Sequence, residues 1–560
     1  LTLPAHSFYW FRLGTDVPVP SWYEQRTAPE EPPILILFDG WTSFFRDRVV
    51  PWRIAMAEKT RAQFEEEVLP RYVQPQRWYA AKGEALKAVR LIDHVLWETR
   101  MGTWMISMFS TEGAPEPACY FLPLALAWED TEEDRLRALT PVRIARVRQQ
   151  ASVGAMGDAF GDEMFCRAVA VGIGRGVELA TAHGKVRFVP TRAYAQLAGD
   201  DVGALPVTPP QGQSSNTIVT LGEKLFLKAY RRIRRGVNPE VEIGRYLTEV
   251  AEFPNCVPLA GVLEHVDETG ALSSLAILQG YVRNQGDAWT YTLEYLARFF
   301  DTHRAGTEVA ADAHGAYLSL VQTLGMRTAE LHAAFARRTG DPAFDPEPAS
   351  EADYAEWKRR VREDAASALD LLARRADQIL PTAAAEARDL LERRDQVLGR
   401  IDALRMPAAT VLKTRHHGDY HLGQVLISRN DFIIIDFEGE PARPIEERRR
   451  KHSPIRDVAG IVRSFSYAAG SALSRAVESP DDEARLGPLA ADWETQTRNA
   501  FLTAYDETAR AAHVYASDAD FRALVELFEL EKALYELKYE LNNRPDWVRW
   551  PLAGIRRLVP

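Results

Sequence analysis

The feature that most constrains this chain is a polar loop followed, at a short distance, by an apolar strand with an acidic end. Asp419 stands five residues before Gln424, and Asp436 comes directly after the apolar run 432–435. A phosphotransfer centre uses an aspartate that accepts the proton of the attacking hydroxyl, an amide five residues later and a second carboxylate after a strand. The spacing therefore predicts a loop, a strand and a turn that meet around one reaction centre.

Each residue of this pattern has an expected role. Asp419 is the expected catalytic base, and Gln424 and Asp436 are the expected ligands of Mg²⁺, which prefers hard oxygen ligands. A zinc site at His417 and His421 is disfavoured, because these histidines lie in a loop and lack the helical His-Glu-x-x-His arrangement. Taken singly, each residue is equally typical of a turn cap, a bonded loop histidine or a strand end. The ordered spacing of the set favours phosphotransfer.

A nucleotide-binding half is expected upstream, where a turn of small residues stands between two short strands. The turn covers 211–217, and its candidate phosphate contacts are Gln213, Ser214, Ser215 and Asn216. Small residues let backbone N–H groups come close to phosphate oxygens, and polar side chains add donors. Such a turn is a weak signal by itself.

Lys228 follows this turn at the end of an alternating strand, where kinases place the lysine that pairs with the α- and β-phosphates. Glu242 lies in a predicted helix downstream and is the expected ion-pair partner of this lysine, with Glu240 as a competitor. A hinge strand is expected next, because such a strand offers backbone groups to adenine. Its candidate nucleotide contacts are Gln279, Tyr281 and Val282.

Several separated motifs extend this pattern along the chain: 236–239, 417–424, 436–441, 451–460, 529–537 and 542–547. Together they strongly resemble the bacterial maltokinases, from about residue 35 to the C-terminus. The resemblance implies an α+β, bilobal fold of the protein-kinase-like, aminoglycoside-phosphotransferase-like type, with a β-rich N-lobe, a large helical C-lobe and an N-terminal cap. It also implies an enzyme that uses ATP and Mg²⁺ to phosphorylate maltose at its anomeric hydroxyl, giving maltose 1-phosphate for α-glucan and glycogen synthesis.

The chain is expected to divide into four segments. Residues 1–33 combine a strand with a Pro-rich linker, 34–130 form the cap, 131–282 the ATP-binding N-lobe and 283–560 the helical C-lobe. The segment 1–13 resembles the closing strand of the C-terminal β-domain of trehalose synthases, and the chain starts at Leu. We therefore expect the C-terminal part of a trehalose synthase–maltokinase fusion, with the trehalose synthase module as a fused or associated partner. Any maltose and trehalose isomerisation would belong to that module.

The acceptor site is expected on the last long helix. Glu531, Tyr535 and Tyr539 are spaced by four residues, so they share one helical face. Aromatic faces stack on pyranose rings and carboxylates accept hydroxyl protons, although a buried tyrosine stripe with salt-bridged neighbours is equally compatible. The candidate acceptor contacts, the last by resemblance alone, are His417, His421, Glu438, Glu531, Lys532, Tyr535, Tyr539 and Arg544.

Composition narrows the alternatives. A net charge of −11 argues against a nucleic-acid-binding surface. Three scattered cysteines provide neither a disulfide framework nor a metal-ligand spacing, which suits a reducing cytosol, so a cytoplasmic protein is expected. The longest apolar stretches are about half the length that spans a bilayer, and no membrane partner is expected.

Two other functions share these signals. A kinase of the same fold that acts on another sugar, an aminoglycoside or choline would keep every catalytic residue and differ only at the acceptor site. A non-catalytic regulatory domain of trehalose synthase is the second alternative. Retention of the whole expected catalytic set argues against a pseudokinase: Lys228, Asp419, Gln424 and Asp436. Glu438 also stays open, either as a further metal ligand or as a sugar contact.

Overall fold

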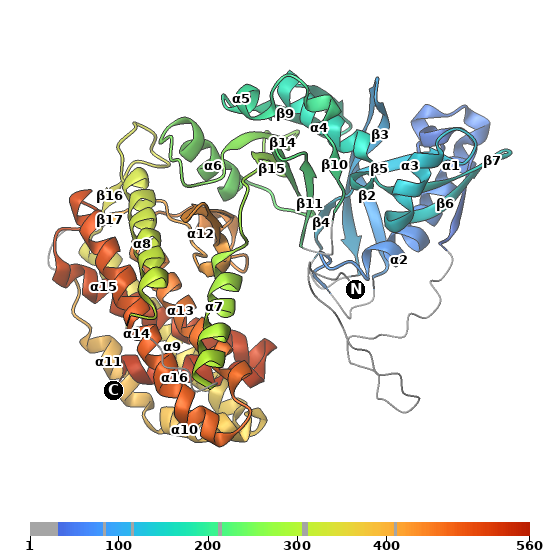
Figure 1. The fold of residues 1–560 in the computed structure, drawn as a ribbon. Helices are drawn as coiled ribbons and strands as arrows, with labels where there is room; N and C mark the ends of the chain where they lie inside the picture. Colours follow the sequence, from blue (N-terminus) through green and yellow to red (C-terminus); the bar gives the residue numbers. More distant parts are fainter. Residues whose placement is uncertain are drawn as a thin grey trace.

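The structure is a computed structural model that describes residues 32–81, 86–113, 117–210, 215–304, 312–407 and 411–559. Two β-sheets occupy the first half of the chain and helices the second half. Figure 1 shows the second sheet, in green, between the first sheet, in blue to cyan, and the helical part, in yellow to red. The predicted segment 1–33, up to residue 31, and the candidates Gln213 and Ser214 lie outside the described residues.

The first sheet is built almost entirely from residues before 160. Its order is β1 (Ile34–Leu37), β6 (Arg143–Gln149), β7 (Ser152–Asp158), β5 (Leu124–Trp128), β3 (Gly102–Glu112), β4 (Cys119–Phe121) and β13 (Arg232–Ile233), with β2 (Ala88–Thr99) also paired to β3. Helices α1 (Ile54–Gln63), α2 (Leu69–Val73) and α3 (Glu133–Leu139) contact its strands. The predicted boundary at 130 falls within this sheet, because β5 pairs with β7 across it.

Alternation along β3 explains how this sheet is buried on two sides. Met105 and Phe109 belong to one apolar core, and Trp104, Ile106 and Met108 belong to another. Successive side chains of a strand point to opposite faces, so one strand contributes to both cores. The second of these cores also contains residues of the next sheet, and the two sheets therefore share buried side chains.

The second sheet is antiparallel and carries the predicted turn and lysine. Its order is β10 (Val207–Thr208), β11 (Asn216–Leu221), β12 (Leu225–Tyr230), β15 (Leu272–Gly280), β14 (Leu259–Asp267), β9 (Gly184–Pro190) and β8 (Glu178–Thr181). Helices α4 (Glu163–Arg175), α5 (Tyr194–Ala198) and α6 (Pro239–Glu249) contact β14. The side chain of Asn238 accepts the N–H of Glu240 and so caps the start of α6.

The helical part packs around one large apolar core. Its helices are α7 (Ala288–Arg304), α8 (Gly315–Phe335), α9 (Glu351–Arg374), α10 (Pro381–Glu392), α11 (Arg394–Ala403), α12 (Ile445–Arg448), α13 (Ile455–Ala476), α14 (Pro480–Ala511), α15 (Asp518–Asn543) and α16 (Arg549–Leu558). Two short antiparallel pairs lie among them: β16 (Glu347–Pro348) pairs with the distant β17 (Leu412–Lys413), and β18 (Val425–Ser428) forms a hairpin with β19 (Asp431–Ile434). None of the helices formed by described residues combines the length and apolarity that a bilayer crossing needs.

The central helix α13 supports the polar loop. A Cβ at Gly460 would lie 2.3 Å from the carbonyl oxygen of Tyr420. Such a contact is far too short, so glycine is needed at this position for the loop to lie directly on α13. The predicted fold, a β-rich lobe followed by a large helical lobe, is confirmed.

Candidate active site

The polar loop is held in place by Asp457, near the start of α13. The backbone N–H groups of His417 and Gly418 donate to its carboxylate at 2.7 and 3.0 Å, and the ring of His332 lies 3.3 Å from it. Burial alone would raise the pKa of Asp457, but the hydrogen bond from His332 and the nearby histidines keep it well below its ordinary value. A charged, fully bonded carboxylate therefore sets the conformation of the loop.

His417 braces this loop instead of making the predicted substrate contact. Its Nε2 lies 2.8 Å from the carbonyl oxygen of Ile435, and its Nδ1 accepts the N–H of Asp419 at 3.4 Å. Both ring nitrogens are used within the protein, and the side chain lines none of the three cavities described below. The Nδ1 of His421 likewise accepts a backbone N–H, that of Gly423, at 3.1 Å.

The hairpin of β18 and β19 brings Gln424 beside Asp436. Val425 pairs with Ile434, and the N–H of Ile435 donates to the carbonyl of Gln424 at 3.0 Å. The two side chains are 3.0 Å apart, from Gln424 Nε2 to Asp436 Oδ2. Asp436 has a φ of +66°, a left-handed conformation that residues other than glycine adopt only at an energetic cost. The strained turn directs this carboxylate toward the second sheet.

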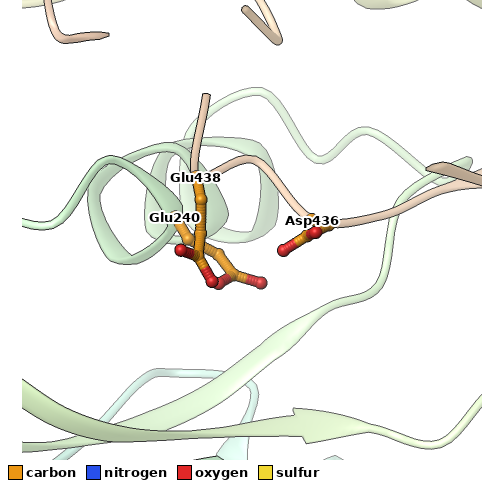
Figure 2. A group of neighbouring side chains, drawn as sticks. All are labelled: Glu240, Asp436 and Glu438. Atoms are coloured by element: carbon orange, nitrogen blue, oxygen red, sulfur yellow. The ribbon is translucent and has the colours of Figure 1, made fainter. Parts of the chain in front are cut away.

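Lys228 stands at the centre of three carboxylates. Its Nζ lies 2.8 Å from Glu240, 2.5 Å from Asp436 and 2.7 Å from Glu438. Figure 2 shows the three acidic side chains converging from α6 and from the turn after β19, and their oxygens lie within 4.8 Å of one another. Burial opposes the charge of Lys228, yet the carboxylates outweigh it and raise its pKa well above the ordinary value.

Glu240, not the predicted Glu242, is therefore the helix partner of Lys228. Residues two apart on an α-helix point to different sides, so only one of the two glutamates can face β12. Glu242 faces the helical lobe, where Arg415 and Arg449 each donate to it at 2.8 Å. Helical periodicity allows either choice, and the packing of α6 between the two lobes decides between them.

Three cavities adjoin one another across the site. The hinge cavity, of about 270 Å³, lies beside β15 and reaches Asp436. The central cavity, of about 310 Å³, is lined by Asp436, Gln424, Glu438 and Asp419. The tail-helix cavity, of about 60 Å³, starts at Asp419 and continues along α15. Asp436 thus joins the first cavity to the second, and Asp419 joins the second to the third.

The hinge cavity contains six of the residues expected to contact a nucleotide: Ser215, Asn216, Lys228, Gln279, Tyr281 and Val282. Its apolar walls were missed from sequence and come from Ile218, Phe226, Val257, Leu426 and Ile435. Phe226 could have been found from strand alternation, because it stands two residues before Lys228 on the same face of β12. Val257 and Leu426 lie in segments that only the tertiary fold brings together.

The tail-helix cavity contains three of the expected acceptor residues. Lys532 Nζ lies 3.7 Å from Asp419 Oδ1 and 5.0 Å from the ring centre of Tyr535. The hydroxyl of Tyr535 donates to Glu440 at 2.7 Å, and Glu531 accepts from Arg456 on α13. The cavity residues missed from sequence include Glu440 and Arg456, which come from segments noted only for their resemblance, and Arg443, which lies between those segments.

Three other expected acceptor residues lie elsewhere. Tyr539 is 43% exposed, and Arg544 pairs with Glu540 at 3.0 Å and lies over the ring of Tyr539. Neither lines the tail-helix cavity. Glu438 lines the central cavity, where Asn216 donates to it at 3.2 Å. Its position matches the alternative of a metal ligand better than that of a sugar contact.

Comparison with known protein families gives a match in the N-terminal region of the chain. Residues 72–162 match the family model of the maltokinase N-terminal cap domain. The chain carries a maltokinase-type cap domain. A glucosamine kinase of Streptacidiphilus jiangxiensis is 26% identical over 366 residues, which are 64% of this chain and 75% of the relative. A glucosamine kinase of Mycolicibacterium smegmatis is 29% identical over 285 residues, 50% of this chain and 61% of that relative.

Solved structures agree on the fold. A glucosamine kinase in complex with glucosamine, ADP and inorganic phosphate has a TM-score of 0.57 at 21% identity and covers 89% of this chain and 99% of its own. A second crystal form of a glucosamine kinase has a TM-score of 0.59 at 20% identity, with the same coverage. The fold is therefore kinase-like, and the curated relatives support a sugar kinase while leaving its acceptor open.

The cap domain reaches the site directly. Trp78 and Ala80 line the central cavity. Arg231, next to the end of β12, forms a buried ion pair with Asp158 at the end of β7 and donates to Thr217 on β11 at 2.6 Å. The Arg231 guanidinium also lies 5.8 Å from the ring centre of Trp78. One buried arginine thus connects the cap domain to the strands that carry the turn and the lysine.

Proposed function

We propose that the protein is an ATP-dependent kinase that phosphorylates maltose at its anomeric hydroxyl. The observation that carries the proposal is the sharing of Asp436 by the hinge and central cavities and of Asp419 by the central and tail-helix cavities. A nucleotide whose base occupies the hinge cavity extends its phosphates past Lys228 into the central cavity. A sugar in the tail-helix cavity presents a hydroxyl to Asp419. This arrangement holds the two reactants in contact, which is the main contribution a protein makes to phosphoryl transfer.

Asp419 is the proposed catalytic base. The sugar oxygen bonds to the terminal phosphorus, the bond from that phosphorus to the bridging oxygen breaks, ADP leaves, and the hydroxyl proton passes to the Asp419 carboxylate. Lys532, 3.7 Å away, lies on the acceptor side of this carboxylate and helps to orient it. The backbone contacts of the loop to Asp457 keep Asp419 in place.

The acidic cluster fits Mg²⁺. Carboxylate oxygens of Asp436 and Glu438 lie within 4.8 Å of each other, and the amide of Gln424 adjoins Asp436. These are hard oxygen donors of the kind that Mg²⁺ prefers. Asp436 and Gln424 would hold the ion, with Glu438 as a further ligand. When bound, the ion would neutralise phosphate charge, and Lys228 would contribute a cationic group to the phosphate oxygens.

The tail-helix cavity is lined by charges of both signs. Arg443, Arg456 and Lys532 all line this cavity. Glu531 is already paired with Arg456 at 2.8 Å, and Glu440 accepts the hydroxyl of Tyr535. Asp364, Asp419 and Asp457 line the cavity as well, so its charges select neither a neutral sugar nor an amino sugar. The cap domain, which matches the maltokinase type, is the observation that favours maltose.

Glucosamine is the second candidate acceptor, because both curated relatives are glucosamine kinases. The deciding experiment measures ADP release with ATP, Mg²⁺ and equal concentrations of maltose, glucosamine, glucose, trehalose or kanamycin. We expect maltose to give the highest kcat/KM and a product with an anomeric phosphate by ³¹P NMR. Highest turnover of glucosamine would replace maltose as the acceptor, and turnover of kanamycin alone would indicate an aminoglycoside kinase. No turnover with any acceptor would favour a non-catalytic domain.

We further propose a cytoplasmic role in α-glucan synthesis, in which maltose 1-phosphate is the product and a trehalose synthase module is the partner. The support is the resemblance of 1–13 to a strand of trehalose synthases and the reduced state expected for three scattered cysteines. Co-purification of the two proteins from one cell extract tests the partnership. Separate elution at all salt concentrations would contradict it.

A further inference from the structure

Arg232, Arg234 and Arg448 line the central cavity, and two of these arginines, Arg234 and Arg448, are held by backbone carbonyls instead of carboxylates. Arg234 follows β13 and Arg448 ends α12, and both share this cavity with Asp419 and Asp436. Across the described ranges, neither guanidinium forms an ion pair with an acidic side chain. Glu438 is the carboxylate of the same cavity that influences both arginines, and it lies 2.7 Å from Lys228.

Backbone carbonyls hold the two guanidiniums side by side. Arg234 donates to the carbonyls of Pro441 and Arg443 at 3.0 and 3.4 Å. Arg448 donates to the same two carbonyls at 3.3 and 2.8 Å, and to that of Glu438 at 3.2 Å. Neutral acceptors fix the direction of the two side chains without cancelling either charge. The two guanidiniums are therefore fixed in position, half-buried and positively charged.

A bound anion would reduce the repulsion between the two guanidiniums. Two like charges that share acceptors repel each other, and the repulsion strengthens away from bulk water. Burial, and then the charge of Arg232, lower the pKa of Arg234; burial, and then the charge of Arg234, lower the pKa of Arg448. A guanidinium presents several N–H groups in a plane and matches the oxygens of a phosphate. The geometry thus calls for a tetrahedral oxyanion between the two arginines and the acidic residues of the cavity.

We propose that Arg234 and Arg448 bind the phosphoryl group during its transfer. The inference rests on the proposed function, because a phosphoryl group that passes from the hinge cavity to the tail-helix cavity must cross the central cavity. In the transition state its charge spreads over its outer oxygens, and fixed donors around those oxygens lower the barrier. Arg448, at the end of α12, donates to the carbonyl of Glu438, so the arginine is fixed directly to the turn that carries Asp436 and Glu438. Trp78 and Ala80 of the cap domain line the same cavity.

The test combines a binding readout with a kinetic one. Arg234→Gln, Arg448→Gln and the double variant are compared with Arg235→Gln, a matched control. Arg235 stands beside Arg234 but is 62% exposed and pairs with Asp267 at 2.8 Å. Calorimetry measures orthophosphate binding to protein saturated with ADP and Mg²⁺, and steady-state assays measure kcat with the best acceptor. We expect the double variant to lose orthophosphate binding at least tenfold and kcat by roughly 100-fold or more, with ADP affinity within about twofold. Arg235→Gln should match the wild type in all three.

The outcomes separate this inference from the proposed function. If the wild type binds orthophosphate, the double variant does not, and no sugar is turned over, the anion site stands and the kinase proposal falls. If sugar is phosphorylated but the double variant keeps its kcat, the role of the arginines is overturned. Absence of orthophosphate binding to the wild type overturns it as well. Lysine at both positions should restore part of the binding, which excludes misfolding as the cause of the loss.

Discussion

Lys228 and Glu240 form a buried ion pair, with 2.8 Å between Nζ and Oε2 and side chains that are 10% and 3% exposed. Two residues further along α6, Glu242 is paired with Arg415 and Arg449 of the helical lobe. Glu240 therefore connects α6 to the second sheet, and Glu242 connects it to the helical lobe. The position of the lysine and the contact between the lobes depend on the same short helix.

The two glutamates should respond differently to substitution. Glu240→Gln leaves Lys228 paired with Asp436 and Glu438. The lysine then competes with the metal ion for these two carboxylates, so we expect kcat/KM for ATP to fall about tenfold or more. Glu242→Gln leaves the buried Arg415 uncompensated and should lower the free energy of unfolding by about 3 kcal/mol. Steady-state kinetics and urea unfolding of both variants check this. Equal kinetic losses in the two would contradict the division of roles.

Asp419→Asn should reduce kcat by about 10²- to 10⁴-fold, because the carboxylate that accepts the hydroxyl proton is removed. Asp419 lines the central and tail-helix cavities but not the hinge cavity, so the dissociation constant of ATP should stay within about twofold. Rapid-mix kinetics and calorimetry measure the two quantities. A loss of kcat smaller than tenfold would argue against Asp419 as the base.

Asp158→Asn should loosen the cap domain from the sheet that carries Lys228. Asp158 and Arg231 are each 3% exposed, and removal of one partner leaves a buried charge unpaired. We expect the free energy of unfolding to fall by about 3 to 5 kcal/mol. Asp134→Asn is the control, because Asp134 lies in the same cap domain with a 99% exposed side chain, and its loss should be near zero. Similar losses for the two variants would contradict a structural role of the pair.

Stability should fall as the pH drops from about 6.5 to 4. Burial lowers the pKa of His416 to about 4, with Arg456 and Arg415 adding to the effect and Asp457 opposing it. Within this window the unfolded chain binds a proton that the folded protein does not, so acid favours unfolding, by about 3 kcal/mol at most. His416→Gln should flatten the pH dependence of the urea midpoint. Part of the slope should remain, because burial also lowers the pKa of His452. An unchanged slope would contradict this assignment.

The sequence predicts the local parts of the site well. Asp419, Gln424 and Asp436 are connected by one loop and one hairpin, so their spacing along the chain nearly determines their spacing in space. The order of a β-rich lobe and a helical lobe follows from patterns of strand and helix that are themselves local. The expected cap boundary at 130 divides the first sheet, because β6 and β7 look like any other strands until their pairing with β1 and β5 is known.

What the sequence by itself determined is the reaction type, through short-range spacing of acids and amides around a loop and a strand. Only the tertiary structure decided that Glu240 faces the lysine, that His417 braces the loop on Asp457 and that Arg234 meets Arg448. The physical reason is that helix rotation, burial and the repulsion of like charges depend on packing between distant segments. No local pattern of residues carries that information.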